Sequence, residues 1–219
     1  MKYFIFSIDD GTIYDQKVIE IFNYFGIKAT FNLNSGLQDF VWYKEDKPVR
    51  RLELYLNKDI YKGHEIASHS LTHPYMTMLG NEEVRFEVEQ DIENIEKIFK
   101  TKVTTFAYPF ENFDERTIAI IKHIPGILQI RVSELDTSFR FPIDQFHIKI
   151  TSWNIDEALE IFKQFKSDEG AKLFVFVAHS YDFEFDNSYD KLKKLCQLVV
   201  DSKDIKVITM NELVKVMKC

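Results

Sequence analysis

The chain has 219 residues, of which 45% are hydrophobic and 29% are charged, and its formal net charge is −7. This composition is typical of a folded globular protein and excludes a disordered one, and the length allows one α/β domain or two small ones. The acidic balance argues against a general nucleic-acid binder, because such proteins carry a basic face.

The N-terminal third predicts a parallel βα arrangement. A short, aromatic-rich apolar run at residues 3–8 suits a buried strand, and it ends at Asp9 and Asp10. Apolar residues then recur at helical spacing over residues 15–25, and residues 29–33 form a second strand candidate. A strand, helix, strand order with a short return predicts that the two strands are parallel.

Targeting segments and disulfides are not indicated. The first apolar run is too short for a signal peptide and lacks a small-residue cleavage site. No apolar run approaches the roughly 20 residues of a membrane span, so we expect a cytoplasmic protein. Cys196 falls in an apolar helical pattern and is expected in the core, whereas Cys219 ends the chain. Neither cysteine has metal-type spacing.

Residues 34–62 show only a partial alternation, over residues 49–56, and we interpret them as an excursion over the surface that could serve as a lid or a substrate wall. A third strand is expected at residues 65–67, with His69 and His73 just beyond it. Two histidines four positions apart can aim their rings at one point if the segment makes a helical turn. Neutral imidazole is the commonest metal ligand in proteins.

The remaining elements continue the alternation of helices and strands. Helices are expected at residues 81–100, 114–123, 156–165, 188–201 and 211–217, with Asn81 and Asp114 as the caps of the first two. Strands are expected at residues 103–107, 127–130, 147–150, 173–178 and 205–208. About seven βα units without repeats or linkers predict a single domain over residues 1–219. The order of elements favours a barrel or an open doubly wound sheet.

Polar groups gather at the ends of four predicted strands: Asp9 with Asp10, His69 with His73, Arg131, and His179. Active sites of parallel α/β folds lie at the carboxyl ends of the strands, so we expect these groups to meet. Taken singly, two aspartates before a glycine are also typical of a turn, and Arg131 of a surface ion pair. Together they favour a catalytic site.

Two imidazoles and one carboxylate, from His69, His73 and Asp10, form the ligand pattern of a catalytic metal with an open coordination position. Zinc, iron(II), cobalt or manganese could use it. Asp9 beside the metal would act as a general base. His179 could protonate a leaving amine as a general acid.

Several stretches carry a resemblance to a known family. Residues 6–11, Phe-Ser-Ile-Asp-Asp-Gly, resemble the first motif of the polysaccharide deacetylases (NodB homology, carbohydrate esterase family 4), which is commonly Thr-Phe-Asp-Asp-Gly. Residues 68–73, Ser-His-Ser-Leu-Thr-His, resemble the second motif, His-Ser/Thr-x-x-His, at a matching separation. Residues 106–110, Phe-Ala-Tyr-Pro-Phe, and 177–181, Val-Ala-His-Ser-Tyr, resemble the third and final motifs.

The resemblance implies a distorted (β/α) barrel with seven or eight strands. It also implies a metal-dependent hydrolase that removes an N-acetyl group from an amino sugar in a polysaccharide or oligosaccharide. Asp10, His69 and His73 match the metal ligands, Asp9 matches the general base and His179 the general acid. The implied cofactor is a divalent metal, zinc first, with cobalt, iron, manganese or nickel as alternatives.

The same resemblance assigns substrate-binding positions and exposes departures. Tyr108 or Phe110 would supply a backbone amide near the oxyanion, and Trp153 is the nearest candidate for the family's tryptophan. Many members have an arginine in the third motif that orients the base; here that position is Ala107. Arg131, at the end of a later strand, is our candidate replacement.

Two alternatives to amino-sugar deacetylation stay open: hydrolysis of another linear or cyclic amide on the same fold, and a non-catalytic barrel that binds a carbohydrate. The altered third motif favours the second, whereas a base and an acid around an open metal favour an enzyme. We expect a carbohydrate or another N-acetylated small molecule as substrate, with no nucleic-acid partner. The lack of a signal peptide argues against an extracellular polymer.

Overall fold

The first strand, β1 (Lys2–Asp9), lies at the centre of the sheet. In the computed structural model, which describes residues 1–217, β1 pairs in parallel with β2 (Thr30–Leu33), β9 (Leu173–His179) and β10 (Ile205–Val207). A strand with neighbours on both edges and helices over it must be apolar on both faces, which explains its continuous aromatic run.

The sheet continues from β2 through β5 (Glu65–Ser68), β6 (Thr105–Ala107), β7 (Gln129–Leu135) and β8 (Ile148–Ile150), all parallel. An isolated bridge between Ser152 and Phe176 brings the end of β8 against β9. The sheet therefore curls into a distorted barrel that is closed by one bridge, with β10 outside the ring beside the first residues of β1. The predicted barrel of seven or eight strands is confirmed.

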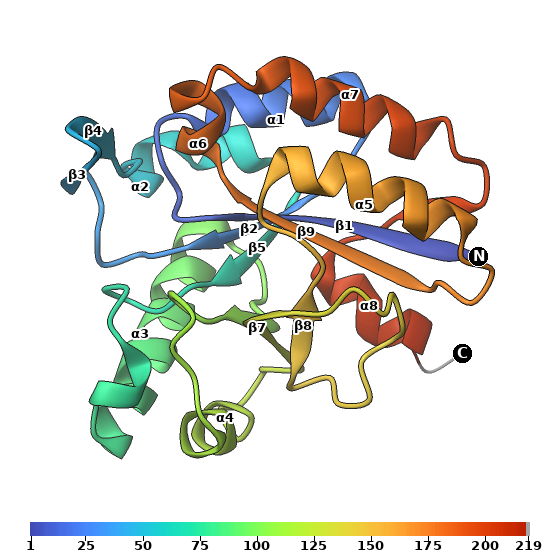
Figure 1. Ribbon diagram of the computed structural model, residues 1–219. Coiled ribbons are helices and arrows are strands. Elements are labelled where there is room, and N and C mark those ends of the chain that lie inside the picture. Colours follow the sequence, from blue (N-terminus) through green and yellow to red (C-terminus); the bar gives the residue numbers. More distant parts are fainter. Residues whose placement is uncertain (218–219) are drawn as a thin grey trace.

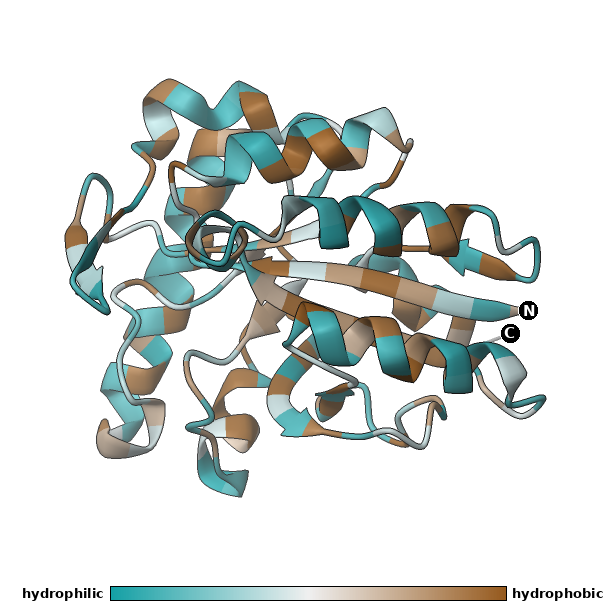
Figure 2. Ribbon diagram, turned by 45° about the horizontal axis from the view of Figure 1, so that its top comes forward, coloured by the Kyte–Doolittle hydropathy of each residue, from teal (hydrophilic) through white to brown (hydrophobic). Residues whose placement is uncertain are grey.

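Helices cover the outside of the curled sheet (Figure 1). The helices α1 (Asp15–Tyr24), α5 (Ile155–Ser167) and α7 (Tyr189–Val200) lie over β1 and β9, whereas α3 (Asn81–Phe99) and α4 (Glu115–Ile121) lie over the β5–β7 side. Figure 2 shows that hydrophilic and hydrophobic residues alternate along these helices, whereas the central strands are largely hydrophobic. Each helix is thus amphipathic and buries one face.

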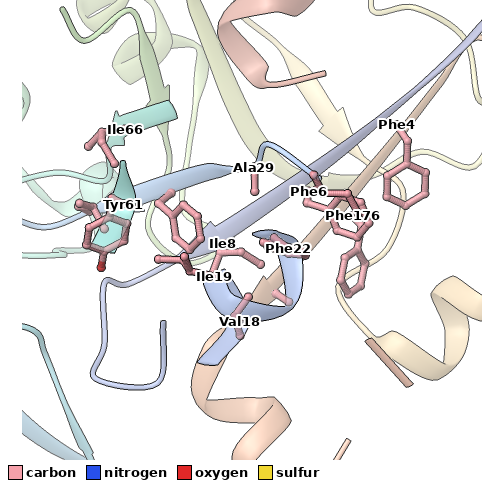
Figure 3. Close-up of a cluster of buried hydrophobic side chains, with 14 of the residues drawn as sticks. Phe4, Phe6, Ile8, Val18, Ile19, Phe22, Ala29, Tyr61, Ile66 and Phe176 are labelled. Atoms are coloured by element: carbon pink, nitrogen blue, oxygen red, sulfur yellow. The ribbon is translucent and has the colours of Figure 1, made fainter. Parts of the chain in front are cut away.

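The core between α1 and the sheet combines aromatic rings with aliphatic side chains (Figure 3). Phe22 of α1 contacts Phe6 of β1 with ring centroids 5.0 Å apart, and Phe4 stacks on Phe174 of β9 at 4.6 Å. All four rings are fully buried. Such rings exclude water from the strands and fix β1 rigidly, so its carboxyl end is a precise platform for a site.

The amino ends of the strands are closed by α8 (Met210–Met217). The buried Glu65 carboxylate accepts hydrogen bonds from Thr30 Oγ1 at 2.7 Å, Thr105 Oγ1 at 2.6 Å and the Asn211 amide at 2.9 Å. Thr30 Oγ1 in turn accepts the Met210 amide at 2.9 Å. The free amides at the start of α8 are therefore satisfied by the barrel interior.

Residues 34–62 form a hairpin, β3 (Val41–Lys44) with β4 (Lys47–Arg50), followed by the short helices α2 (Leu54–Asn57) and η1 (Lys58–Tyr61). The hairpin stands beside the carboxyl ends of the strands, at the left of Figure 1. This arrangement agrees with the interpretation of an excursion that walls the site.

Several local predictions need correction. Gly80, not Asn81, caps α3, because its amide bonds to Glu83 Oε2 at 2.7 Å. Arg131 lies inside β7 and not after it, since β7 runs on to Leu135. Two short helices, α6 (Ser180–Phe185) and η2 (Met76–Met78), were not expected.

Other predictions have mixed outcomes. Cys196 is buried as expected, and Cys219 lies outside the described residues. None of the helices in residues 1–217 combines the length and the apolar character needed to cross a membrane. The single domain over residues 1–219 and the cytoplasmic location stay predictions.

Candidate active site

A cavity of about 810 Å³ opens at the carboxyl ends of the strands. Every site residue predicted from the sequence lines it: Asp9, Asp10, His69, His73, Tyr108, Phe110, Arg131, Trp153 and His179. The parallel topology explains this convergence, because β1, β5, β7 and β9 all end at the same rim.

Asp10, His69 and His73 form a compact cluster of donors. Their ligand atoms lie within 4.8 Å of one another, and His73 Nε2 is 3.3 Å from Asp10 Oδ1. Burial lowers the pKa of His69, and burial together with the neighbouring His69 lowers the pKa of His73 to about 3. Both imidazoles are therefore neutral, which is the form that binds metal.

The same cluster contains an unsatisfied atom that suits a cation. Asp10 Oδ1 is buried and accepts no hydrogen bond within the described residues, although Arg51 Nη2 lies 3.1 Å away as an ion pair. A buried carboxylate oxygen without a donor is costly unless something else neutralises it. Two neutral imidazoles and this oxygen thus fit a divalent ion.

The two histidines converge through an irregular turn, and not through the helical turn that is one way to bring residues four apart together. Ser70 and His73 have left-handed φ values of 67° and 56°. Asn34 Nδ2 donates to the carbonyl oxygens of His69 and Ser70, and this pair of bonds holds the turn in place. His69 Nδ1 donates to the Ala107 carbonyl at 2.8 Å, which leaves Nε2 free to face the cluster.

Asp91 of α3 stabilises the segments that lead into this turn. It accepts hydrogen bonds from Ser68 Oγ at 2.6 Å and from the Ser35 amide at 2.7 Å. Burial raises the pKa of Asp91 to about 7, although these bonds oppose the rise. The carboxyl therefore takes up a proton near neutral pH in the folded protein but only near pH 4 in the unfolded chain.

This difference predicts a pH dependence of stability. Because the folded pKa is raised, the contribution of Asp91 is fully present below the unfolded pKa and is lost as pH rises through about 7. Relative to Asp91→Asn, wild type should lose up to about 4 kcal/mol of unfolding free energy between pH 4 and pH 8, measured by urea denaturation. If the unfolding free energies of wild type and Asp91→Asn change with pH in parallel, this prediction is wrong.

Asp9 is held by side chains from two other strands, β2 and β7. Arg131 Nη2 donates to both carboxylate oxygens, at 2.8 and 2.7 Å, and Asn32 Nδ2 donates to Oδ1 at 2.6 Å. Burial acts to raise the pKa of Asp9, but the surrounding charges, the Arg131 guanidinium first, hold this pKa below its usual value. Asp9 is therefore ionised and fixed in direction.

The guanidinium on Asp9 comes from β7, although Ala107 occupies the third-motif position on β6. Ala107 and Arg131 are register partners across these two strands. The small alanine side chain and the Arg131 side chain thus belong to the same layer of the barrel. Arg131 therefore gives Asp9 a guanidinium partner in place of the arginine that Ala107 replaces in the third motif.

Asp10 is anchored from the hairpin side. Its φ is 86°, and Arg51 Nη1 donates both to its carbonyl oxygen and to Asn34 Oδ1. The Arg51 guanidinium lies over the Trp42 ring, 4.7 Å from its centroid. Burial acts to raise the pKa of Asp10, but the surrounding charges, the Arg51 guanidinium first and His179 next, outweigh it, so this pKa is lowered.

His179 ends β9 directly opposite Asp9, its register partner on β1. Its Nε2 lies 3.8 Å from Asp10 Oδ2, and its Nδ1 donates to Asp182 Oδ2 at 3.1 Å. Burial lowers the pKa of His179, but the hydrogen bond to Asp182 and the Asp10 and Asp9 carboxylates raise it by more. The imidazole is thus readily protonated next to the cluster.

The residues expected to bind substrate differ in their roles. The Tyr108 amide donates to the Arg131 carbonyl at 3.0 Å, so it belongs to the sheet and cannot serve an oxyanion. The Phe110 amide has no acceptor within residues 1–217 and stays a candidate. The Phe110 ring stacks on Tyr75 at 4.3 Å, and Trp153 is 41% exposed on the cavity wall.

Comparison with known proteins assigns the chain to a family. The polysaccharide deacetylase family profile matches residues 1–125. The chain belongs to the polysaccharide deacetylase family. The matched part contains Asp9, Asp10, His69 and His73, and it ends before Arg131 and His179.

Two curated relatives match about half of the chain. The uncharacterized protein YlxY of Bacillus subtilis is 30% identical over 121 residues, which are 55% of this chain and 34% of that protein. Chitin deacetylase 1 of Cryptococcus neoformans is 24% identical over 120 residues, 54% of this chain and 26% of that protein. The matches therefore span about a third or less of these relatives.

Solved structures of the polysaccharide deacetylases share the fold over nearly the whole chain. The Xyl-CE4 domain of a xylanase from the hindgut metagenome of Trinervitermes trinervoides has a TM-score of 0.68 at 18% identity, covering 99% of this chain and 91% of that one. A family 4 acetyl xylan esterase from Clostridium thermocellum, in complex with cobalt, gives 0.68 at 15% identity, with 99% and 92% coverage. A family 4 pseudoenzyme from Bacillus anthracis gives 0.65 at 20%, with 97% and 65% coverage.

Several residues that complete the candidate site carry no clear signal in the sequence: Asn32, Asn34, Trp42, Lys44, Arg51, Tyr181 and Asp182. Asn32 could have been found, because it lies at the carboxyl end of a predicted strand beside that of Asp9. Tyr181 follows the final motif closely, and its hydroxyl donates to Asp10 Oδ2 at 3.2 Å. Arg51 carries no local signal, since only the packing of the hairpin brings it inward.

Proposed function

We propose that this chain is a divalent-metal-dependent hydrolase that removes the N-acetyl group from an amino sugar in a polysaccharide or oligosaccharide. The observation that carries the proposal is the joint presence of three metal-type donors, an ionised Asp9 and a protonatable His179 around one cavity. A binding protein needs neither a base nor an acid at such a position.

The proposed mechanism gives each side chain one task. A divalent ion on Asp10, His69 and His73 would act as a Lewis acid toward the acetamide carbonyl and would lower the pKa of water, to about 7 in favourable zinc sites. Asp9, aimed by Arg131, accepts the proton of the attacking water. Because the pKa of Asp9 is low, it needs a water that is already acidified.

The second half of the reaction expels the amine. The Phe110 amide donates to the developing oxyanion. His179 donates its Nε2 proton to the departing nitrogen, and acetate and a free amine result. An amide nitrogen must be protonated to leave, so a protonated imidazole suits an N-acetyl substrate. The curated name of one relative, chitin deacetylase 1, supports the same preference.

The cavity wall supports a sugar substrate. Its apolar part contains the exposed faces of Phe110, Trp153 and Phe40. Aromatic faces pack well against the C–H faces of sugar rings, while the polar groups gather at the cluster. We propose zinc as the metal, because it prefers this nitrogen and oxygen donor set; cobalt, iron, manganese and nickel are the alternatives.

The experiment joins metal content to product release. Purified protein should contain close to one equivalent of divalent metal and should release acetate from N-acetylated chito-oligosaccharides, and a chelator should abolish the release. His73→Ala should lose both metal and turnover. His147→Ala is the matched control, because His147 pairs with Glu134 outside the cavity.

Three outcomes would contradict the proposal. Turnover that survives removal of the metal would exclude a metal-dependent reaction. Acetate release only from acetylated xylo-oligosaccharides, or hydrolysis only of cyclic amides, would exclude an amino-sugar substrate. The chain would then still be a hydrolase, but of another substrate class. Saturable sugar binding without release of acetate by the metal-loaded protein would favour a non-catalytic barrel.

A further inference from the structure

The β3–β4 hairpin makes direct contacts with α6, the helix that begins immediately after His179. Lys44 Nζ of β3 forms an ion pair with Asp182 Oδ1 at 2.5 Å. The Trp42 ring meets the Tyr181 ring edge to face, with centroids 5.7 Å apart. The hairpin is therefore fastened to the first turn of α6.

Asp182 joins this contact to His179. Its second oxygen, Oδ2, accepts the hydrogen bond from His179 Nδ1 at 3.1 Å, while Oδ1 binds Lys44. A carboxylate can only accept hydrogen bonds, so the imidazole must carry a proton on Nδ1. Nε2 is then the atom that faces Asp10, 3.8 Å from its Oδ2.

The ring is also held against rotation. The His179 imidazole stacks on the Tyr181 ring with centroids 5.0 Å apart and an interplanar angle of 18°. Lys44 Nζ lies on the same ring, 5.1 Å from its centroid. The lysine charge thus touches both groups that fix the imidazole, namely the Asp182 carboxylate and the Tyr181 ring.

We propose that Asp182 and Lys44 are positioning residues for His179, and that the β3–β4 hairpin contributes to catalysis through Lys44 alone. Asp182 fixes the tautomer that presents Nε2 to the substrate, and Lys44 fixes which way Asp182 points. The inference rests on the proposed function, which makes His179 the proton donor.

The ion pair itself adds little to stability. The side chains of Lys44 and Asp182 are 42% and 29% exposed, and partly exposed pairs contribute weakly. A second lysine on the same hairpin, Lys47, donates to the Phe185 carbonyl at 3.3 Å and is absent from the cavity wall. Lys47→Met therefore removes the same charge from the hairpin without touching Asp182.

The first test reads the tautomer by long-range ¹H–¹⁵N correlation on histidine-labelled protein at alkaline pH. Wild type should show His179 protonated on Nδ1. In Asp182→Asn, Lys44 attracts the amide oxygen, so the amide NH₂ faces the ring and the proton should move to Nε2. Adding Lys44→Met to Asp182→Asn removes that attraction, and a mixture of tautomers should appear.

The second test measures kcat and KM for acetate release. Asp182→Asn should lower kcat by about 10²-fold or more with little change in KM, since general-acid catalysis is worth about 10² to 10⁴. Lys44→Met should lower kcat up to about fivefold, and Lys44→Arg should restore it. Lys47→Met should match wild type in kcat and in the His179 signals.

The two readouts separate the inference from the proposed function. If no variant and not even wild type releases acetate, the proposed function fails, while the tautomer measurement still decides the positioning roles. An unchanged tautomer in Asp182→Asn overturns the inference. If Asp182→Asn does not fold, the kcat values of Lys44→Met and Lys47→Met are compared instead. Equal kcat values for these two variants overturn the positioning inference.

Discussion

Asp9→Asn is expected to lower kcat by about 10²- to 10⁴-fold while the metal content stays at the wild-type level. Asparagine cannot accept the proton of the attacking water. It also turns an NH₂ group or an uncharged oxygen toward Arg131, which donates to both oxygens of Asp9 in the native protein. The measurement is steady-state acetate release together with metal analysis of the same sample.

Asp10→Asn provides the contrast to Asp9→Asn. Asp10 belongs to the donor cluster with His69 and His73, so its amide variant should lose metal and turnover together. Near-wild-type turnover of Asp9→Asn on a true substrate would exclude Asp9 as the base. Loss of metal by Asp9→Asn would mean that Asp9 is itself a ligand and that the roles of the two aspartates need to be reversed.

Arg131→Ala is expected to cost about 3 to 5 kcal/mol of unfolding free energy, because it leaves the buried Asp9 carboxylate without its charged partner. The folded pKa of Asp9 is lowered, so its stabilising contribution is present above the unfolded pKa and is lost as pH falls through the folded pKa. The stability gap between wild type and variant should therefore narrow in acid. Urea denaturation at several pH values measures it.

Arg131→Ala also offers a rescue that depends on register. Ala107 is the cross-strand partner of Arg131, so the double variant Ala107→Arg with Arg131→Ala returns a guanidinium to the same layer of the barrel. We expect it to recover part of both stability and turnover. A double variant no better than Arg131→Ala would show that Asp9 can be oriented only from β7.

The fold could be predicted from the spacing of the apolar residues and from the polar residues at the strand ends. The β1 and β9 runs could be read as buried strands because both faces are covered, and their polar ends then had to meet at one rim. The boundaries were less predictable. The sequence pattern puts Arg131 after its strand because a charged residue does not resemble a buried strand position, yet a carboxylate at hydrogen-bond distance stabilises it inside β7.

The details of the site depend on contacts between distant segments. Asp10 and the two histidines could be grouped by residue type, but the turn that aims them depends on Asn34 and on left-handed backbone angles. The family motif suggests the Tyr108 amide for the oxyanion, but the pairing of β6 with β7 uses that amide in a hydrogen bond to the Arg131 carbonyl. Arg51 and Asp182 have the same origin, since neither has a local signature.

The pairing of β1 with β9 has a consequence for how activity arises during folding. The donors Asp10, His69 and His73 all come from the first third of the chain, whereas His179 reaches Asp9 only when β9 docks along β1. Contacts between segments so far apart form slowly. During folding, the proposed acid therefore joins the donor cluster only once β9 has paired with β1.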